Sequence, residues 1–269
     1  MTRKITLAHL SAIDLPPPAL IEAAARAGFD GVGLRLIRVT AETPGYPLMS
    51  DPAMMRETLA AIRDTGVGVP DIEFVRVTPE FDAAALAPFL DAGAELGARH
   101  VIAAPYDDDH ARLAGGLAAL AELAGARGIG VALEFFPWTS VPDLSTCWRV
   151  AREAGEGVGV LVDCLHFDRS GSDLDVLAGL PPERLPFAHL CDAPVAPPYA
   201  LDDLLSTARE ARLPPGEGEI DLGAIIAALP PATPLGVEVP MRGAVEGASL
   251  AERLRRLRAA ADAVLKGLG

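Results

Sequence analysis

The stretch VGVLVDCLH, residues 158–166, decides the fold. Its first residues are β-branched or apolar, as in a parallel strand buried on both faces, yet it ends in Asp163 and His166. A carboxylate in such a setting has a high desolvation cost unless a cation pairs with it. No Lys or Arg lies within the stretch, so we expect the partner of Asp163 to come from another part of the chain.

Short apolar runs of this kind alternate with Ala- and Leu-rich stretches in which apolar residues recur at three and four positions, as in amphipathic helices. Most of these stretches end in Gly, which suits a left-handed helix C-cap. The predicted strands are 5–11, 31–37, 69–77, 100–106, 130–136, 158–166, 186–193 and 234–240.

Eight such units predict an α/β fold, namely a single-domain (β/α)8 TIM barrel over residues 1–269, with a C-terminal closing helix at about 247–267. An open, doubly wound sheet is less favoured, because no GxGxxG turn follows the first strand.

Composition limits the partners. The formal net charge is −14 and the isoelectric point is about 4.7, so phosphate backbones and anionic membranes are repelled and we expect no nucleic-acid or membrane binding. No signal peptide or membrane span is expected, because no run of apolar residues is long enough. Three cysteines without CxxC spacing favour free thiols in the reducing cytoplasm.

Polar residues stand in each of the last four predicted strands, and the C-terminal strand ends are where a TIM barrel builds its active site. These residues are Glu134, Asp163, His189 and Glu238. Their strands contain no Lys or Arg, and one shared divalent metal ion resolves the cost of burying three carboxylates. A mixed oxygen and nitrogen ligand set suits Mn²⁺, Mg²⁺, Co²⁺ or Zn²⁺, of which we expect Mn²⁺. The alternative is four unrelated features, with acids that cap helices or loops and a His satisfied in the core.

Several segments resemble the xylose-isomerase-like TIM-barrel superfamily: LEFFPW, VDCLHF, FAHLCDAP, RLPPGEGEIDL and LGVEVP, in this order. The superfamily includes sugar-phosphate isomerase/epimerase-type proteins, inosose-processing enzymes, ketose 3-epimerases, 3-dehydroshikimate dehydratases and family 2 AP endonucleases. The resemblance implies an enzyme with one divalent ion held by Glu134, Asp163, His189 and Glu238. It also allows a homodimer.

The same resemblance places His166, the last residue of the D-x-x-H pattern, toward the substrate. Arg212 stands just before the P-G-x-G turn and matches an Arg that contacts substrate oxygens, although it can instead pair with Glu217 or Glu219. His9 and Trp138 are further candidates for substrate binding, with packing as the alternative.

Two departures from the family pattern matter. The AP endonuclease branch uses a His-rich zinc site, whereas this chain has five His residues and an acidic composition, so DNA repair is disfavoured. Gly33 stands where many relatives have a Glu.

The implied activity is isomerisation or epimerisation of a small polyhydroxylated carbonyl compound, a sugar, sugar phosphate or inosose, through an enediolate. Glu134 and Glu238 would transfer the proton as a general acid/base pair, assisted by His166. A metal-dependent lyase of the 3-dehydroshikimate dehydratase type is the alternative. A non-catalytic barrel is a third possibility, which the paired Glu134 and Glu238 argue against.

Overall fold

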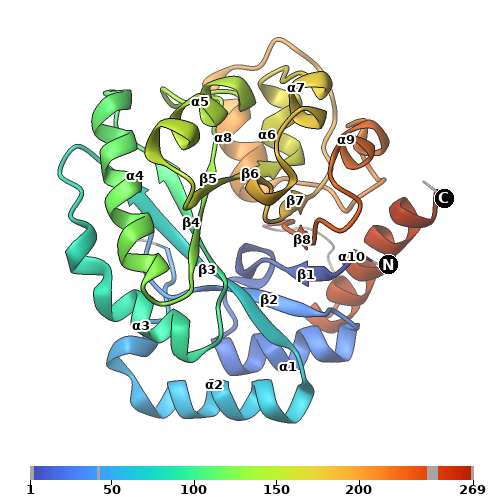
Figure 1. The fold of residues 1–269 in the computed structure, drawn as a ribbon. Coiled ribbons are helices and arrows are strands. Elements are labelled where there is room, and N and C mark those ends of the chain that lie inside the picture. The colour runs from blue at the N-terminus through green and yellow to red at the C-terminus, as the bar shows by residue number, and fades with distance from the viewer. Residues whose placement is uncertain (1–2, 41–42, 241–247, 268–269) are drawn as a thin grey trace.

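The protein, analysed as a computed structural model that describes residues 3–40, 43–240 and 248–267, is a closed barrel of eight parallel strands. The strands follow one another around the barrel in chain order, and helices surround them (Figure 1). The predicted (β/α)8 TIM barrel is therefore confirmed. No helix in the described part of the chain is long and apolar enough to cross a membrane.

The strands are β1 (Ile5–Leu7), β2 (Gly31–Arg35), β3 (Gly68–Val77), β4 (His100–Pro105), β5 (Gly130–Glu134), β6 (Val158–Asp163), β7 (Ala188–Leu190) and β8 (Leu235–Val237). The α-helices are α1 (Pro17–Ala27), α2 (Pro52–Thr65), α3 (Ala87–Glu95), α4 (His110–Gly125), α5 (Leu144–Ala154), α6 (Cys164–Arg169), α7 (Leu174–Ala178), α8 (Leu201–Glu210), α9 (Leu222–Ala228) and α10 (Leu250–Gly267). Short 3-10 helices are η1 (His9–Ala12), η2 (Leu48–Ser50), η3 (Ala83–Leu86) and η4 (Pro182–Arg184).

Strand residues alternate between the layer of helices and the barrel interior. On β6, Val160 and Val162 belong to the main apolar core, whereas Leu161 belongs to a small separate cluster. The other buried members of that cluster are Ile102, Ala132 and Phe187. On β5, β6 and β7 the next inward positions are the polar residues Glu134, Asp163 and His189, so this side of the barrel changes from an apolar interior to a polar mouth.

Every predicted strand except 69–77 ends earlier than expected, and the strands predicted at 158–166 and 5–11 show why. β6 stops at Asp163 and α6 begins at Cys164, because the Asp163 carboxylate accepts hydrogen bonds from the backbone N–H groups of Leu165 (2.8 Å) and His166 (3.2 Å). β1 stops at Leu7, and η1 follows it.

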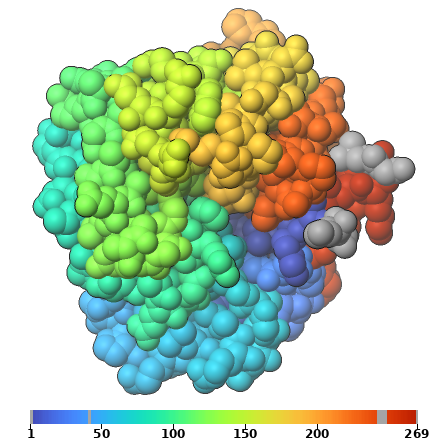
Figure 2. Space-filling model, in the orientation of Figure 1, coloured from blue at the N-terminus to red at the C-terminus, as the bar shows by residue number. Residues whose placement is uncertain are grey.

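The last α-helix of the chain packs against the first. The closing helix is α10, which packs against α1 (Figure 1), while its predicted start at about residue 247 lies outside the described residues. The N-terminal segments, from blue to green, and the C-terminal segments, from yellow to orange, meet across the face shown in Figure 2.

His100 makes the fold sensitive to pH. His100 is the first residue of β4, and the centroid of its imidazole lies 5.7 Å from that of the Phe187 ring. Burial, with a smaller effect of Arg99, lowers the pKa of His100 to about 4. Below about pH 6.5 the unfolded chain binds a proton at this residue and the folded chain does not, so His100 lowers the free energy of unfolding as the pH falls toward 4.

Between about pH 7.5 and about pH 5.5, we expect the free energy of unfolding to fall by about 1 kcal/mol more in the wild type than in His100→Gln. The reason is that Gln does not titrate. Urea denaturation of both proteins at the two pH values measures this difference. The same pH dependence in both would contradict the assignment.

Candidate metal centre

Four side chains converge at the C-terminal end of the barrel: Glu134, Asp163, His189 and Glu238. Each offers one ligand atom, these atoms lie within 4.8 Å of one another, and all four residues are buried. They come from the ends of β5 and β6, from β7, and from the position directly after β8. Asp163 pairs with His189 in the sheet register, so neighbouring strands present these groups at one height.

The His189 imidazole lies among the three carboxylates. Its Nδ1 atom is 3.5 Å from Glu238 Oε2, 3.8 Å from Asp163 Oδ2 and 4.0 Å from Glu134 Oε1. Nδ1 is buried and has no hydrogen-bond partner. Burial opposes a charge on the ring, but the carboxylates, Glu238 first among them, raise the pKa of His189 to about 10. A nitrogen donor surrounded by oxygen donors at these separations fits a divalent cation held between them.

Arg212, predicted to contact the substrate, pairs with two of the candidate ligands, which corrects the expectation that no buried base could serve. It follows α8, and its Nη1 atom lies 2.5 Å from Asp163 Oδ2 while Nη2 lies 3.1 Å from Glu238 Oε2. The alternative of pairing with Glu217 is not seen, because Glu217 pairs with Arg256. The predicted contact of Arg212 with a substrate stays a prediction.

The turn after Arg212 is held in place by Asp192. The backbones of Asp192 and Leu213 form a bridge, and the Asp192 carboxylate accepts from the N–H groups of Gly216 (2.9 Å) and Ile220 (3.1 Å). Gly218 is required by close approach, because a Cβ there would stand 2.3 Å from Asp192 Oδ1. The P-G-x-G turn therefore fixes the loop that carries Arg212.

Arg212 does not neutralise the centre. In the deprotonated form that binds a metal, with three ionised carboxylates and a neutral His189, the Arg212 guanidinium still leaves two negative charges. Among the described residues, the basic groups within 4.0 Å of Glu134 are the rings of His166 and His189. Burial and the charge of Glu238 raise the pKa of Glu134 well above its usual range. This residual negative charge is what a divalent cation would offset.

His166 and Trp138 lie together beside Glu134. His166 Nε2 is 3.9 Å from Glu134 Oε1, and its ring stands edge-on to Trp138 at 5.2 Å between centroids. Burial lowers the pKa of His166 to about 4, so the ring is neutral near neutral pH. His166 Nδ1 and Trp138 Nε1 are buried without hydrogen-bond partners. Both groups keep a hydrogen-bonding atom without a partner, and their predicted contact with a substrate stays a prediction.

His9 differs from these two. Its Nδ1 accepts from the backbone N–H of Arg35 at 2.9 Å, its Nε2 donates to the Leu15 carbonyl at 2.9 Å, and its ring stacks on Tyr46. Both ring nitrogens are therefore occupied within the protein. The predicted substrate contact of His9 stays a prediction, and it would have to use the carbon atoms of the ring because both nitrogens are bonded.

The buried side-chain atoms without partners share one location. Within residues 3–40, 43–240 and 248–267 these atoms are Arg35 Nε, Glu73 Oε1, Trp138 Nε1, His166 Nδ1 and His189 Nδ1. All belong to strands, or to segments directly after strands, around the barrel mouth. Buried polar groups are normally paired, so this concentration marks a site built for a polar ligand. Arg35 and Glu73 were missed from the sequence, although each interrupts an apolar run.

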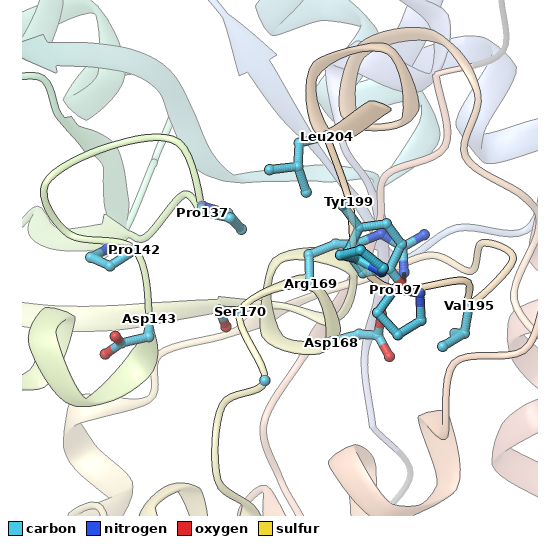
Figure 3. A pocket seen from close by; sticks show the side chains of 12 residues that line it. Pro137, Pro142, Asp143, Asp168, Arg169, Ser170, Val195, Pro197, Tyr199 and Leu204 are labelled. Atoms are coloured by element: carbon cyan, nitrogen blue, oxygen red, sulfur yellow. Dashed lines mark hydrogen bonds and ion pairs between the residues drawn. The ribbon is translucent and has the colours of Figure 1, made fainter. Parts of the chain in front are cut away.

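A cavity of about 680 Å³ is lined by residues of the segment between β5 and α5, of α6 and of the segment before α8 (Figure 3). Pro137, Asp168 and Tyr199 are among the residues that line it, and none of the four candidate ligands does. Arg169 closes one side by bonding to Asp168 (2.5 Å) and to the Tyr199 hydroxyl (2.9 Å). α6 carries both His166, beside Glu134, and Asp168, which lines the cavity.

A family model described as a xylose isomerase-like TIM barrel matches residues 21–261. The chain belongs to this family. Within it, the chain is 28% identical over 226 residues to a 3-dehydroshikimate dehydratase of Pseudomonas putida, over 78% of this chain and 33% of that protein. It is 29% identical over 145 residues to an inosose isomerase of Bacillus velezensis, covering 50% of each chain.

Among solved structures, the IOLI protein with a binding zinc atom superposes with a TM-score of 0.80 at 18% identity, over 99% of both chains. At this identity the likeness shows the fold. The chain spans about a third to a half of the length of the two curated relatives, so their names alone do not fix its reaction.

We expect the wild type to bind about one Mn²⁺. The Glu134→Gln variant should bind Mn²⁺ at least about tenfold more weakly, because the amide replaces a charged ligand without disturbing Arg212. Titration calorimetry and metal analysis after dialysis measure this. Glu183→Gln, a change in η4, is the matched control and should bind like the wild type. Unchanged affinity in Glu134→Gln would contradict the assignment of this ligand.

Arg212→Met should destabilise the metal-free protein by about 3–5 kcal/mol, because Asp163 and Glu238 lose their guanidinium partner while still buried. Added Mn²⁺ should restore part of this loss by supplying a replacement charge. Urea denaturation with EDTA and with Mn²⁺ tests both statements. The control Arg256→Met removes an exposed pair with Glu217 and should cost less than about 1 kcal/mol. Equal losses in the two variants would refute the buried-charge account.

Proposed function

We propose that the chain is a divalent-metal-dependent isomerase or epimerase of a small polyhydroxylated carbonyl compound, such as a sugar, a sugar phosphate or an inosose. The observation that carries this proposal is the pair Glu134 and Glu238, which flank Asp163 and His189 in one buried centre. Binding alone needs one set of ligands, whereas moving a proton between two carbon positions or faces needs paired acid/base groups.

Glu134, Asp163, His189 and Glu238 would hold the metal, and Mn²⁺ is the ion we propose. When bound, a divalent cation supplies a Lewis acid that polarises a substrate carbonyl and makes the neighbouring C–H more acidic. The zinc atom in the solved IOLI structure supports a divalent ion in this fold and keeps Zn²⁺ as an alternative, with Mg²⁺ and Co²⁺.

The side chains at the centre would carry out proton transfer and substrate binding. One of Glu134 and Glu238 takes the proton from the substrate carbon, and the other returns a proton to the resulting enediolate. Return to the opposite face gives an epimer, and return to the neighbouring carbon gives the aldose or ketose isomer. Neutral His166 and the indole N–H of Trp138 bond substrate hydroxyls beside Glu134, and Arg212 orients a substrate oxygen.

A lyase is the second candidate. It is supported by the 3-dehydroshikimate dehydratase of Pseudomonas putida, which aligns with 78% of this chain. One glutamate of the same pair would then take the C–H proton and the other would protonate the β-hydroxyl, which leaves as water, while neutral His166 hydrogen-bonds the leaving oxygen. The two reactions share every residue named above, so they differ in the substrate that the mouth of the barrel accepts.

The proposed partner is a small molecule, and the net charge of −14 supports the absence of nucleic-acid and membrane binding. Three buried cysteines without disulfides support a reducing compartment, and we propose the cytoplasm. A homodimer stays a prediction.

The test is solvent exchange. In D₂O with Mn²⁺, the wild type should introduce deuterium at a carbon next to the carbonyl of an inosose or a ketohexose, as followed by NMR. Exchange with a rearranged or inverted product supports the isomerase or epimerase, whereas water loss from 3-dehydroshikimate without exchange of the neutral compounds would establish the lyase instead.

His166→Asn should lower kcat about 100-fold or more while leaving Mn²⁺ binding unchanged, because His166 bonds the substrate and lies outside the candidate ligands. Steady-state kinetics and metal titration measure the two effects. His110→Asn changes a His at the start of α4 and serves as the control. A full rate in His166→Asn would remove His166 from the mechanism.

A further inference from the structure

The mouth of the barrel carries a second polar group, on β2 and β3, that the proposed acid/base chemistry does not use. Arg35 pairs with Glu73 in the sheet register, and Gly33 pairs with Asp71 two residues earlier. The neighbours Leu34 and Ile72 belong to the core under the helices, so Arg35, Asp71 and Glu73 face the barrel interior.

Arg35 and Glu73 approach each other without completing a hydrogen bond. Arg35 Nε lies 3.3 Å from Glu73 Oε1, the two side chains are 8% and 2% exposed, and both atoms lack a hydrogen-bond partner. A buried N–H donor and a buried carboxylate acceptor are thus both open at the same point. A hydroxyl group is the simplest ligand that satisfies both, because it accepts one hydrogen bond and donates another.

The backbone of Arg35 is held on both sides. Its N–H donates to His9 Nδ1 at 2.9 Å, and its carbonyl accepts from the N–H of Tyr46 at 3.0 Å. His9 is in turn fixed by the Leu15 carbonyl. This network explains what the buried, fully bonded His9 does, and it presents the guanidinium in a set position toward the mouth.

The surroundings of this pair disfavour an anion. Asp71 occupies the space that a side chain at position 33 would take, since a Cβ on Gly33 would stand 2.3 Å from Asp71 Oδ1. Two carboxyl groups therefore face one guanidinium on β2 and β3, and burial followed by Glu73 raises the pKa of Asp71 to about 7. At a pH above the pKa of Asp71 and with Glu73 ionised, a substrate carboxylate or phosphate would meet two carboxylates and one guanidinium here.

Arg35 and Glu73 stand on neighbouring strands of the same closed barrel whose last four strands provide the metal centre. Burial is the main cause that raises the pKa of Glu73, and the charge of Glu238 adds to it. Burial acts against the lowered pKa of Glu238, which His189 and Arg212 lower most and Arg35 lowers further. Glu73 nevertheless lies outside the group of four candidate ligands. A molecule held at the centre by its carbonyl can therefore extend one end toward β2 and β3 and another toward His166 and Trp138.

We propose that Arg35 and Glu73 form a hydroxyl-binding subsite that selects a neutral polyhydroxylated substrate over an acidic one. Arg35 Nε–H donates to a substrate hydroxyl remote from the reacting carbonyl, and that hydroxyl donates to Glu73 Oε1. Both residues are specificity-determining rather than catalytic. This inference rests on the proposed function, because it needs a small carbonyl compound at the centre.

The experiment is equilibrium binding to the Mn²⁺-loaded protein, by calorimetry, of three probes: scyllo-inosose, D-fructose and 3-dehydroshikimate. The proteins are the wild type, Glu73→Gln, Arg35→Gln and, as the control on β3, the exposed Arg76→Gln. We expect at least one neutral probe to bind the wild type more tightly than 3-dehydroshikimate does. Glu73→Gln and Arg35→Gln should each weaken that neutral probe about tenfold or more, with Mn²⁺ affinity and the control unchanged.

Three results would overturn the subsite. The first is neutral-probe affinity that is unaffected in both variants, which would make Arg35 and Glu73 a structural ion pair only. The second is 3-dehydroshikimate as the tightest ligand of the wild type, with that binding lost in Arg35→Gln, which would make Arg35 a carboxylate clamp. The third is a wild type that binds Mn²⁺ but none of the probes, which contradicts the proposed function itself and is distinguishable from the other two.

Discussion

The burial of carboxylates at one end of the barrel is the constraint on which this structure depends. Five acids face the interior from β3, β5, β6 and the end of β8, where water cannot stabilise their charges: Asp71, Glu73, Glu134, Asp163 and Glu238. Each must be protonated, hydrogen-bonded or paired with a cation. The cationic partners differ among these five acids. Arg212 pairs with Asp163 and Glu238 and Arg35 approaches Glu73, while the basic groups beside Glu134 among the described residues are the rings of His166 and His189. The unequal compensation is the physical reason for expecting a metal ion.

The barrel and the four convergent residues follow from the sequence because both depend on local periodicity. Alternation on a strand such as VGVLVD assigns Leu161 and Asp163 to one face, and closure of eight strands brings the ends of β5 to β8 together. Once the eight strands are assigned, the meeting of Glu134, Asp163, His189 and Glu238 needs no further information. His166 follows from its position three residues after Asp163, although α6, rather than the strand, carries it.

What the sequence did not predict are contacts between residues far apart in the chain. Arg212 reaches Asp163 from a loop that the backbone bridge between Asp192 and Leu213 and the Asp192 carboxylate hold in place. The approach of Arg35 to Glu73 depends on the register between β2 and β3, which shifts between Gly31 and Gly33. Gly33 looked like a departure from the family pattern, and the structure shows that its missing side chain leaves room for Asp71. Such registers are set by packing across the whole barrel, which no local pattern encodes.

The relatives of this chain include an isomerase and a dehydratase, which fits a centre whose acid/base pair serves both reactions. The metal remains the claim on which the rest of the account depends, and X-ray absorption spectroscopy at the Mn edge of the loaded protein tests it most directly. The account predicts a coordination shell that combines carboxylate oxygens with one imidazole nitrogen, and loss of the imidazole scattering in His189→Gln. A shell of oxygens alone, identical in the wild type and in His189→Gln, would contradict it.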